Sequence, residues 1–110
     1  MQPSLHTAAN GHLTLEFGTY DSALWSAISN YLEIDLGFSR TGQVVVAGTG
    51  EGVRQGFQQG ELTLDAGWDN WSGDYLLSNS AEGDDLLRRL LDVVQAESAS
   101  RLGLIQALGG

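Results

Sequence analysis

Hydrophobic and polar residues alternate with period two in two parts of the chain, as they do in strands that bury one face. The alternation covers residues 13–17 and, more regularly, residues 32–38. A polar segment at residues 39–42 then leads into the β-branched run at residues 44–46. The sequence therefore predicts a strand at 13–17 and a hairpin formed by 32–38 and 44–46.

Two further strands are predicted on either side of an aromatic, acidic segment. Leu62 and Leu64 mark the first strand, and residues 75–77 form its partner. Between residues 48 and 60 the chain is rich in glycine and poor in large apolar side chains, so we predict a long loop there. The aromatic, acidic segment would then lie at the tip of a hairpin.

Residues 22–31 are predicted to form a helix. Leu24, Ile28 and Tyr31 recur at i, i+4 and i+7, which is the spacing of one helical face. Asp21 stands where an N-cap is needed, and aspartate is among the preferred residues there. A β structure for this segment stays open as the alternative.

Residues 84–95 are predicted to form the longer helix of the chain. Apolar side chains stand at positions 86, 87, 90, 91, 93 and 94, which gives the helix one hydrophobic face. Asp84 and Asp85 suit the positive end of the helix dipole. Each is followed four residues later by an arginine, Arg88 or Arg89, so we expect two surface ion pairs.

Strand pairs, one long helix and no internal repeat predict a single α+β domain over residues 1–110. At 110 residues and 42% hydrophobic, the chain can bury one core but not two. The expected architecture is an antiparallel sheet of four to five strands, with the long C-terminal helix and the shorter helix on one face. Residues 1–12 and 99–110 are expected to be loosely ordered, with a short last turn as the alternative for the second segment.

Composition narrows the chemistry that is available. The chain has no cysteine, no lysine, five arginines and a formal net charge of −9. Without cysteine there is no disulfide, thiolate nucleophile or Cys-ligated metal. The negative charge disfavours nucleic acid or an anionic membrane as a direct ligand, because phosphate binding needs basic side chains on one face. We expect a cytoplasmic protein, since residues 1–12 lack export-signal features and no apolar run approaches the ~18 residues that span a bilayer.

The charge is concentrated in residues 61–85. This segment has seven acids and no basic residue, so it contributes −7 of the net −9, while the rest of the chain has seven acids against five arginines. Two tryptophans and a tyrosine lie among these acids. Carboxylates around flat aromatic side chains are typical of a surface that attracts a basic partner and stacks on it. The predicted partner-binding residues are Asp65, Trp68, Asp69, Asn70, Trp71, Asp74 and Tyr75.

The sequence does not determine whether Trp68 and Trp71 are exposed or lie in the core. Strand alternation would send one of Trp68 and Trp71 into the core even if the other is exposed, and an aromatic residue in a strand is often there for packing. An exposed tryptophan flanked by Asp69 and Asp74 would suit an arginine of the partner.

No catalytic or metal-binding motif is recognisable in the chain. His6 and His12 have no nucleophile motif beside them. Residues 44–52 look like a strand entering a phosphate-binding loop, but the G-x-G-x-x-G spacing fails and a P-loop lysine is missing. The clustered acids lack the residue order of an EF-hand, so a solvated acidic loop is favoured over a cation site. We therefore expect no catalytic residue, no metal and no cofactor.

In its size, its charge and the aromatic, acidic block at residues 67–75 followed by a helix, the chain resembles the small acidic immunity proteins that bacteria encode beside secreted toxins. The resemblance implies an α+β antitoxin, without enzymatic activity, that covers the basic active site of a cognate toxin domain. Two alternatives stay open: an acidic mimic of nucleic acid of the kind that phages encode, and a small enzyme or carrier domain. The sequence determines neither the activity of the toxin nor the oligomeric state.

Overall fold

The computed structural model describes residues 3–46 and 50–109, with side chains up to residue 97. Its elements in chain order are β1 (Ser4–Thr7), β2 (Leu13–Glu16), α1 (Ser22–Asn30), the π-helix η1 (Tyr31–Asp35), β3 (Ser39–Thr41), β4 (Val45–Val46), β5 (Gly52–Gln59), β6 (Leu62–Asp69), β7 (Gly73–Ser78) and α2 (Ala81–Gly109). The seven strands of this described part form one antiparallel sheet. Their order is β1-β2-β7-β6-β5-β3, and β4 also pairs with β5.

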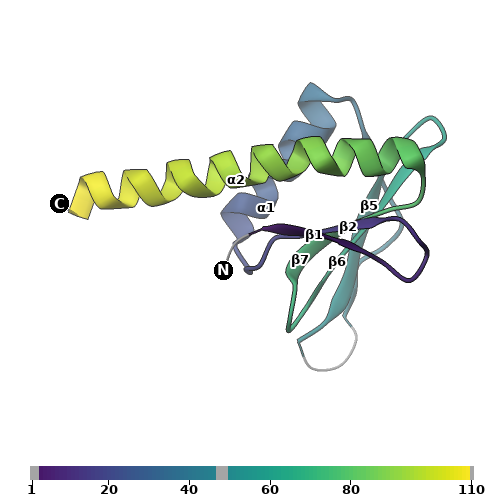
Figure 1. Cartoon of the computed structure of the whole chain (residues 1–110), viewed down its shortest axis with the longest axis horizontal. Coiled ribbons are helices and arrows are strands. Elements are labelled where there is room, and N and C mark those ends of the chain that lie inside the picture. Colours follow the sequence, from purple (N-terminus) through teal and green to yellow (C-terminus); the bar gives the residue numbers. More distant parts are fainter. Residues whose placement is uncertain (1–2, 47–49, 110) are drawn as a thin grey trace.

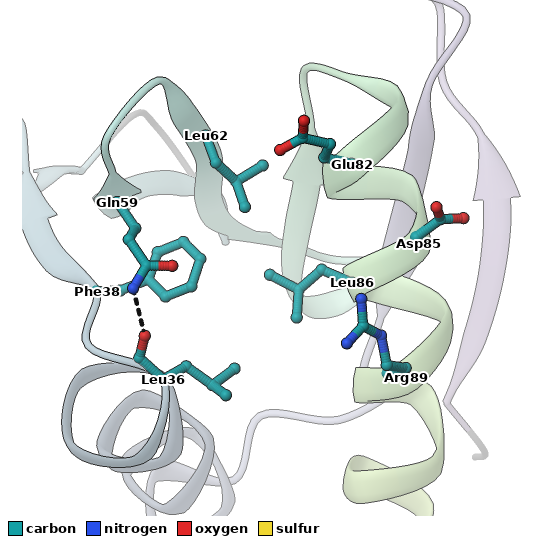
Figure 2. Close-up of a pocket in the computed structure, with 8 residues that line it drawn as sticks. All are labelled: Leu36, Phe38, Gln59, Leu62, Glu82, Asp85, Leu86 and Arg89. Atoms are coloured by element: carbon teal, nitrogen blue, oxygen red, sulfur yellow. Dashed lines mark hydrogen bonds between the residues drawn. The ribbon is translucent and has the colours of Figure 1, made fainter.

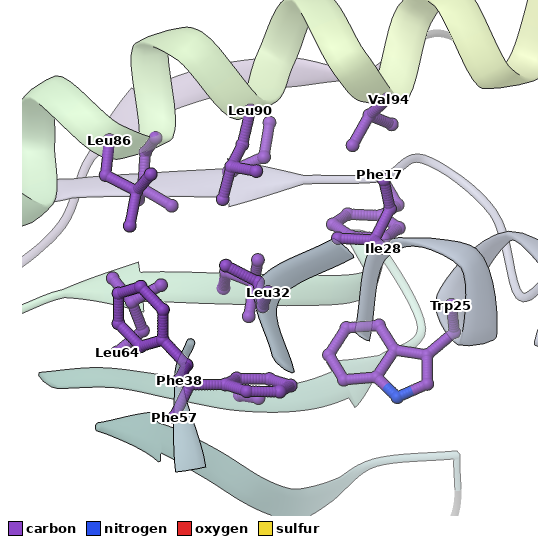
Figure 3. Packing of buried hydrophobic residues seen from close by; sticks show 14 of the residues in the cluster. Phe17, Trp25, Ile28, Leu32, Phe38, Phe57, Leu64, Leu86, Leu90 and Val94 are labelled. Carbon is purple, nitrogen blue, oxygen red and sulfur yellow. The ribbon is translucent and has the colours of Figure 1, made fainter. Parts of the chain in front are cut away.

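The helices α1 and α2 cover one face of the sheet (Figure 1). Their apolar side chains meet those of the strands in a single core, where Leu86, Leu90 and Val94 of α2 point toward Phe17, Leu32 and Leu64 (Figure 3). The α+β class with a long C-terminal helix is thus confirmed. The expected number of four to five strands was too low, because strands also form in segments predicted as a loose lead, a turn and a loop.

Five of the predicted elements are present. Residues 13–16 form β2, and the strands predicted near Leu62 and at 75–77 are β6 and β7, paired along their length. The first predicted helix is α1, which Asp21 caps by accepting hydrogen bonds on Oδ1 from the backbone N–H groups of Ala23 and Leu24, both at 3.0 Å. The predicted helix at 84–95 lies within α2.

The strand predicted at residues 32–38 is wrong. The chain stays helical through η1, and the N–H of Leu36 donates to the carbonyl of Tyr31 at 3.1 Å. Leu32 is fully buried one helical turn after Ile28, whereas Ile34, which strand alternation would also have buried, is 77% exposed. Core burial at helical spacing therefore overrides the local alternation. The hairpin with 44–46 is absent, since β3 and β4 each pair with β5.

The described part of the predicted glycine loop forms a strand instead. Residues 47–49 lie outside the described residues, but β5 begins at Gly52. A Cβ at Gly52 would lie 2.3 Å from Cζ2 of Trp68, and one at Gly56 would lie 2.5 Å from the carbonyl oxygen of Leu64. These two glycines allow close packing of neighbouring groups, which sequence alone does not distinguish from loop flexibility.

Both terminal segments are more regular than predicted. Ser4–Thr7 pairs with β2 as strand β1, and Leu5 lies opposite the buried Leu15, so the core orders this lead. At the other end α2 continues to Gly109, and its last part projects beyond the rest of the domain (Figure 1). Residues 96–109 include alanine, leucine and glutamine and no proline, so their helix propensity permits this extension.

The ion pairs predicted along α2 are arranged differently. Arg88 pairs with Asp85 at i, i+3, with 2.6 Å between Nη1 and Oδ1. Asp84 turns to the β1–β2 loop, where Oδ1 accepts from the N–H of Leu13 at 2.9 Å and Oδ2 lies 3.0 Å from Nδ1 of His12. These bonds, that from Leu13 first, lower the pKa of Asp84 from 3.8 to about 2. The carboxylate therefore joins α2 to the sheet.

We expect Asp84→Asn to remove a pH-dependent part of the stability. Because the folded state lowers the pKa of this acid, its charge stabilises the fold fully above pH 3.8 and ceases to do so as the pH falls toward about 2. The difference in unfolding free energy between the parent and the variant should thus grow with pH across this window. Urea unfolding at a series of acidic pH values measures it, and a constant difference would contradict this role of Asp84.

Candidate functional site

The face of the sheet opposite the helices forms the candidate site. In an antiparallel sheet, directly opposed residues point to the same face. The register therefore places one row of residues across five strands on the uncovered side: Glu16 of β2, Tyr75 of β7, Gly67 of β6, Val53 of β5 and Val45 of β4. We call this row, together with Glu51, Asp65 and Asp69 at its sides, the open face.

An apolar strip runs through the open face. Gly67 has no side chain to separate Tyr75 from β5, and a Cβ there would lie 2.6 Å from the Tyr75 hydroxyl oxygen. The Tyr75 ring therefore lies across Gly67, and the exposed Val53 and Val45 continue the strip. A hollow of about 180 Å³ is lined by Glu51, Val53, Asp69 and Tyr75 of the open face, together with Gly52 and Trp68, which alternate with Val53 and Asp69 along β5 and β6.

Carboxylates flank this strip. Burial raises the pKa of Tyr75 above its ordinary value, and the negative charges of Asp69, Asp65 and Glu51 raise it further. The three acids thus act on the tyrosine electrostatically. Glu16 adds a fourth carboxylate at the end of the row, 3.3 Å from Nε2 of His6.

None of the arginine side chains that the structure describes reaches the open face. Arg40 lies over the ring of Phe57 on the helix-covered side, and Arg54 lies on the same side. Arg88 and Arg89 belong to α2. The negative potential of the open face is therefore not neutralised by described arginines, and it suits a positively charged ligand.

Trp68 and Asp74, which were predicted to bind a partner, lie on the other side of the sheet. The guanidinium carbon of Arg54 lies 4.8 Å from the ring centroid of Trp25 and 5.0 Å from that of Trp68. Its Nε and Nη2 donate to Oδ1 of Asp74 at 3.1 and 2.9 Å. The protein's own arginine thus occupies the stacking and acceptor site that the sequence assigned to an arginine of the partner.

Asp74 is almost wholly buried, with 1% of its surface exposed. Burial raises the pKa of this carboxyl group, and this effect outweighs the lowering by the hydrogen bonds and charge of Arg54. The residue holds Arg54 between two tryptophans, so its role is structural and the predicted surface role is wrong.

The other predicted residues lie at or near the surface. Asp65 is exposed and its Oδ2 accepts a hydrogen bond from Nδ2 of Asn79 at 3.2 Å. Asp69 shapes the β6–β7 turn, because its Oδ1 accepts from the N–H groups of residues 71 and 72 at 2.9 and 2.6 Å. Trp71 is 81% exposed in that turn. Asn70 lies beside Gly50, where an added Cβ would be 2.0 Å from Oδ1 of the asparagine.

Besides Gly67, four residues of the open face were not predicted from the sequence: Glu16, Val45, Glu51 and Val53. Glu16 belongs to a strand that was predicted, and its alternation does place this glutamate opposite the core, but the pairing with Tyr75 depends on the register. Val45, Glu51 and Val53 follow from the pairing of β4 with β5, which no local signal in the glycine-rich segment indicated.

A second hollow lies at the other end of β6. It has a volume of about 280 Å³ and lies between the start of α2, the β5–β6 turn and the segment after η1 (Figure 2). Gln59 closes one side by donating from Nε2 to the carbonyl of Leu36 at 2.7 Å. The rim carries Glu82 and Asp85 but also Arg89, so its charge selects a ligand less strongly than that of the open face.

The described residues contain no group of three or more His, Asp or Glu side chains placed to hold a metal ion. Their helices include none that combines the length and hydropathy required to cross a membrane. Comparison of the chain with protein-family models, with curated proteins and with solved structures finds no match.

Proposed function

We propose that the chain is a non-enzymatic binding protein that neutralises a basic protein partner, as an immunity protein neutralises its cognate toxin. One observation carries the proposal: four carboxylates surround an apolar strip on a sheet face that no described arginine reaches. A protein that mimics nucleic acid needs only an array of carboxylates in place of the phosphates. The apolar strip is an additional feature, and it favours a protein partner over the role of a mimic. It offers desolvated contact area to a protein, with the acids as a charged rim.

Binding would proceed by attraction followed by docking. The net charge of −9 raises the local concentration of a cationic partner, and the open face concentrates that attraction. Tyr75 and Val53 then lose water against the partner, while Asp65 and Glu51 accept hydrogen bonds from its arginine or lysine side chains. A domain seated in this way covers the basic surface on which it docks. We propose the cytoplasm as the place of action.

Co-expression with the basic protein encoded by a neighbouring gene tests the proposal. We expect a complex that survives gel filtration, and restored growth of cells in which the neighbour alone is toxic. The double variant Asp65→Asn, Asp69→Asn should weaken both effects, because an asparagine at position 69 retains the oxygen that shapes the turn while losing the charge. Asp92→Asn on α2 is the matched control. Stable co-expression without a complex or rescue would reject the proposal.

We expect the association rate of this complex to fall steeply with salt. Steering by the open face depends on charges that are screened once the Debye length falls to ~8 Å near 0.15 M ionic strength. The dissociation rate should change much less. Stopped-flow measurements from about 20 to about 500 mM salt check this, and the Asp65→Asn, Asp69→Asn variant should show the shallower dependence. A rate that is indifferent to salt would remove the steering step.

We expect Trp71→Ala to weaken the complex by ~2–4 kcal/mol without changing the melting temperature. The indole is 81% exposed, so the folded state loses little packing when it is removed. Calorimetric titration and thermal melting of the same sample measure the two effects. Ile34→Ala, which truncates an apolar side chain of similar exposure on η1, serves as the control. Equal affinities of the two variants would show that the turn does not contact the partner.

A further inference from the structure

Strand β4 forms an exposed apolar edge of the sheet. It pairs with β5 on one side, and no other described strand pairs with it. Val44, Val45 and Val46 are 58%, 52% and 73% exposed. The backbone groups on the outer side of such an edge are a template for another strand, and exposed apolar side chains add to the attraction.

The opposite edge of the sheet is protected. Pro3 precedes β1, and β1 itself presents Ser4, His6 and Thr7 together with the partly buried Leu5. Proline and polar side chains are common means of preventing unwanted strand addition. Residues 43–46 contain neither a charge nor a proline. Of the two edges of the sheet, the β4 edge is therefore the one that is open to another strand.

We propose that the partner adds an extended, basic segment to β4. This inference rests on the proposed function, because it states how the same partner is held. Val45 points to the open face opposite Val53, so every second side chain of an added strand would lie on that face beside the apolar strip. Basic side chains at these positions would pack their aliphatic stems against Val45 and extend their charged ends toward Glu51. A second copy of the chain fits this edge poorly, since two molecules of charge −9 repel each other.

A synthetic peptide tests strand addition directly. The probe is a blocked heptapeptide that alternates arginine and valine, compared with the same peptide carrying N-methylated amides throughout. At low salt, the first peptide should slow hydrogen exchange of those amides among Val44, Val45 and Val46 that point away from β5, and the methylated one should not. Val45→Lys should weaken binding about tenfold, whereas Ile34→Lys, which adds the same charge at an exposed apolar position on η1, should weaken it about twofold.

Three outcomes would overturn the inference. Equal binding of the methylated peptide would mean that carboxylates hold basic side chains without strand pairing, and the proposed function would stand. If neither peptide protects the β4 amides, strand addition is likewise excluded and the proposed function still stands. A concentration-dependent dimer that Val45→Lys abolishes would show that the edge is occupied by a second copy. Protection by the peptide together with failure of the co-expression test would remove the proposed toxin partner and leave strand addition in place.

Discussion

Replacing Leu90 with alanine is expected to lower the free energy of unfolding by ~2–5 kcal/mol. Leu90 is fully buried where α2 lies on the sheet, and its side chain points into the core between Leu86 and Val94 (Figure 3). Removal of the side chain loses apolar burial and leaves a cavity that rigid neighbours fill only in part. Urea denaturation followed by tryptophan fluorescence measures the change.

Asp92→Ala on the same helix is the control for this experiment. The residue is exposed, so its substitution should change the unfolding free energy by no more than about 0.5 kcal/mol. A Leu90→Ala variant that unfolds at the same urea concentration as the control would contradict the packing of α2 against the sheet.

Asp74→Ala is expected to destabilise the fold by ~2–4 kcal/mol, somewhat less than the breaking of a fully buried ion pair. The substitution leaves the Nε and Nη2 donors of Arg54 without their carboxylate acceptor, between two tryptophan rings. Arg54 keeps 31% of its side-chain surface exposed, so water restores part of the lost hydrogen bonding. Thermal and urea unfolding measure the loss.

Asp74→Asn separates the charge from the hydrogen bonds. Asparagine keeps an oxygen that can accept from Arg54, so we expect less than half of the alanine effect. Any loss of partner binding in either variant should follow the unfolded fraction. A fully folded Asp74→Ala protein with a large binding defect would return this residue to the interaction surface.

The elements that could be predicted from the sequence are those whose burial pattern is local. In α2, apolar positions recur on one helical face, and packing agrees with that face at Leu87, Leu90 and Val94. Likewise, Asp21 stands one residue before α1 and caps it through its own side chain. In both cases the groups that decide the structure lie within a few residues of one another.

The failures have non-local causes. Leu32 satisfies a strand pattern with residues 34, 36 and 38, but it also lies four residues after Ile28, and only the core formed with α2 decides between these patterns. The strand at β5 needs Gly52 beneath Trp68 and Gly56 beside Leu64, which are contacts across the sheet. Such register-dependent contacts leave no periodic signal in one segment.

The candidate site could be predicted only in part, because some of its contacts are local in the chain and others are not. Asp65, Asp69 and Tyr75, to which the excess of acids and aromatic side chains in residues 61–85 drew attention, lie together on the open face. Strand alternation places Trp68 and Asp74 on the opposite side, where Arg54 engages them. That arginine is 20 residues from Asp74 in the chain, so composition of the acidic segment gave no sign of it.

Helices cover only one face of the sheet, so each strand has two sets of side chains with different roles. The inward side chains form the core, and the outward side chains set the shape and charge of the open face. Along β6, Leu64 and Ala66 are buried while Asp65 between them faces solvent, and along β7 Leu76 is buried beside the outward Tyr75. Substitutions at outward positions alter shape and charge without opening cavities beneath the helices. Under the proposed function, the residues that contact the partner could therefore change in evolution while the folding free energy stays nearly constant.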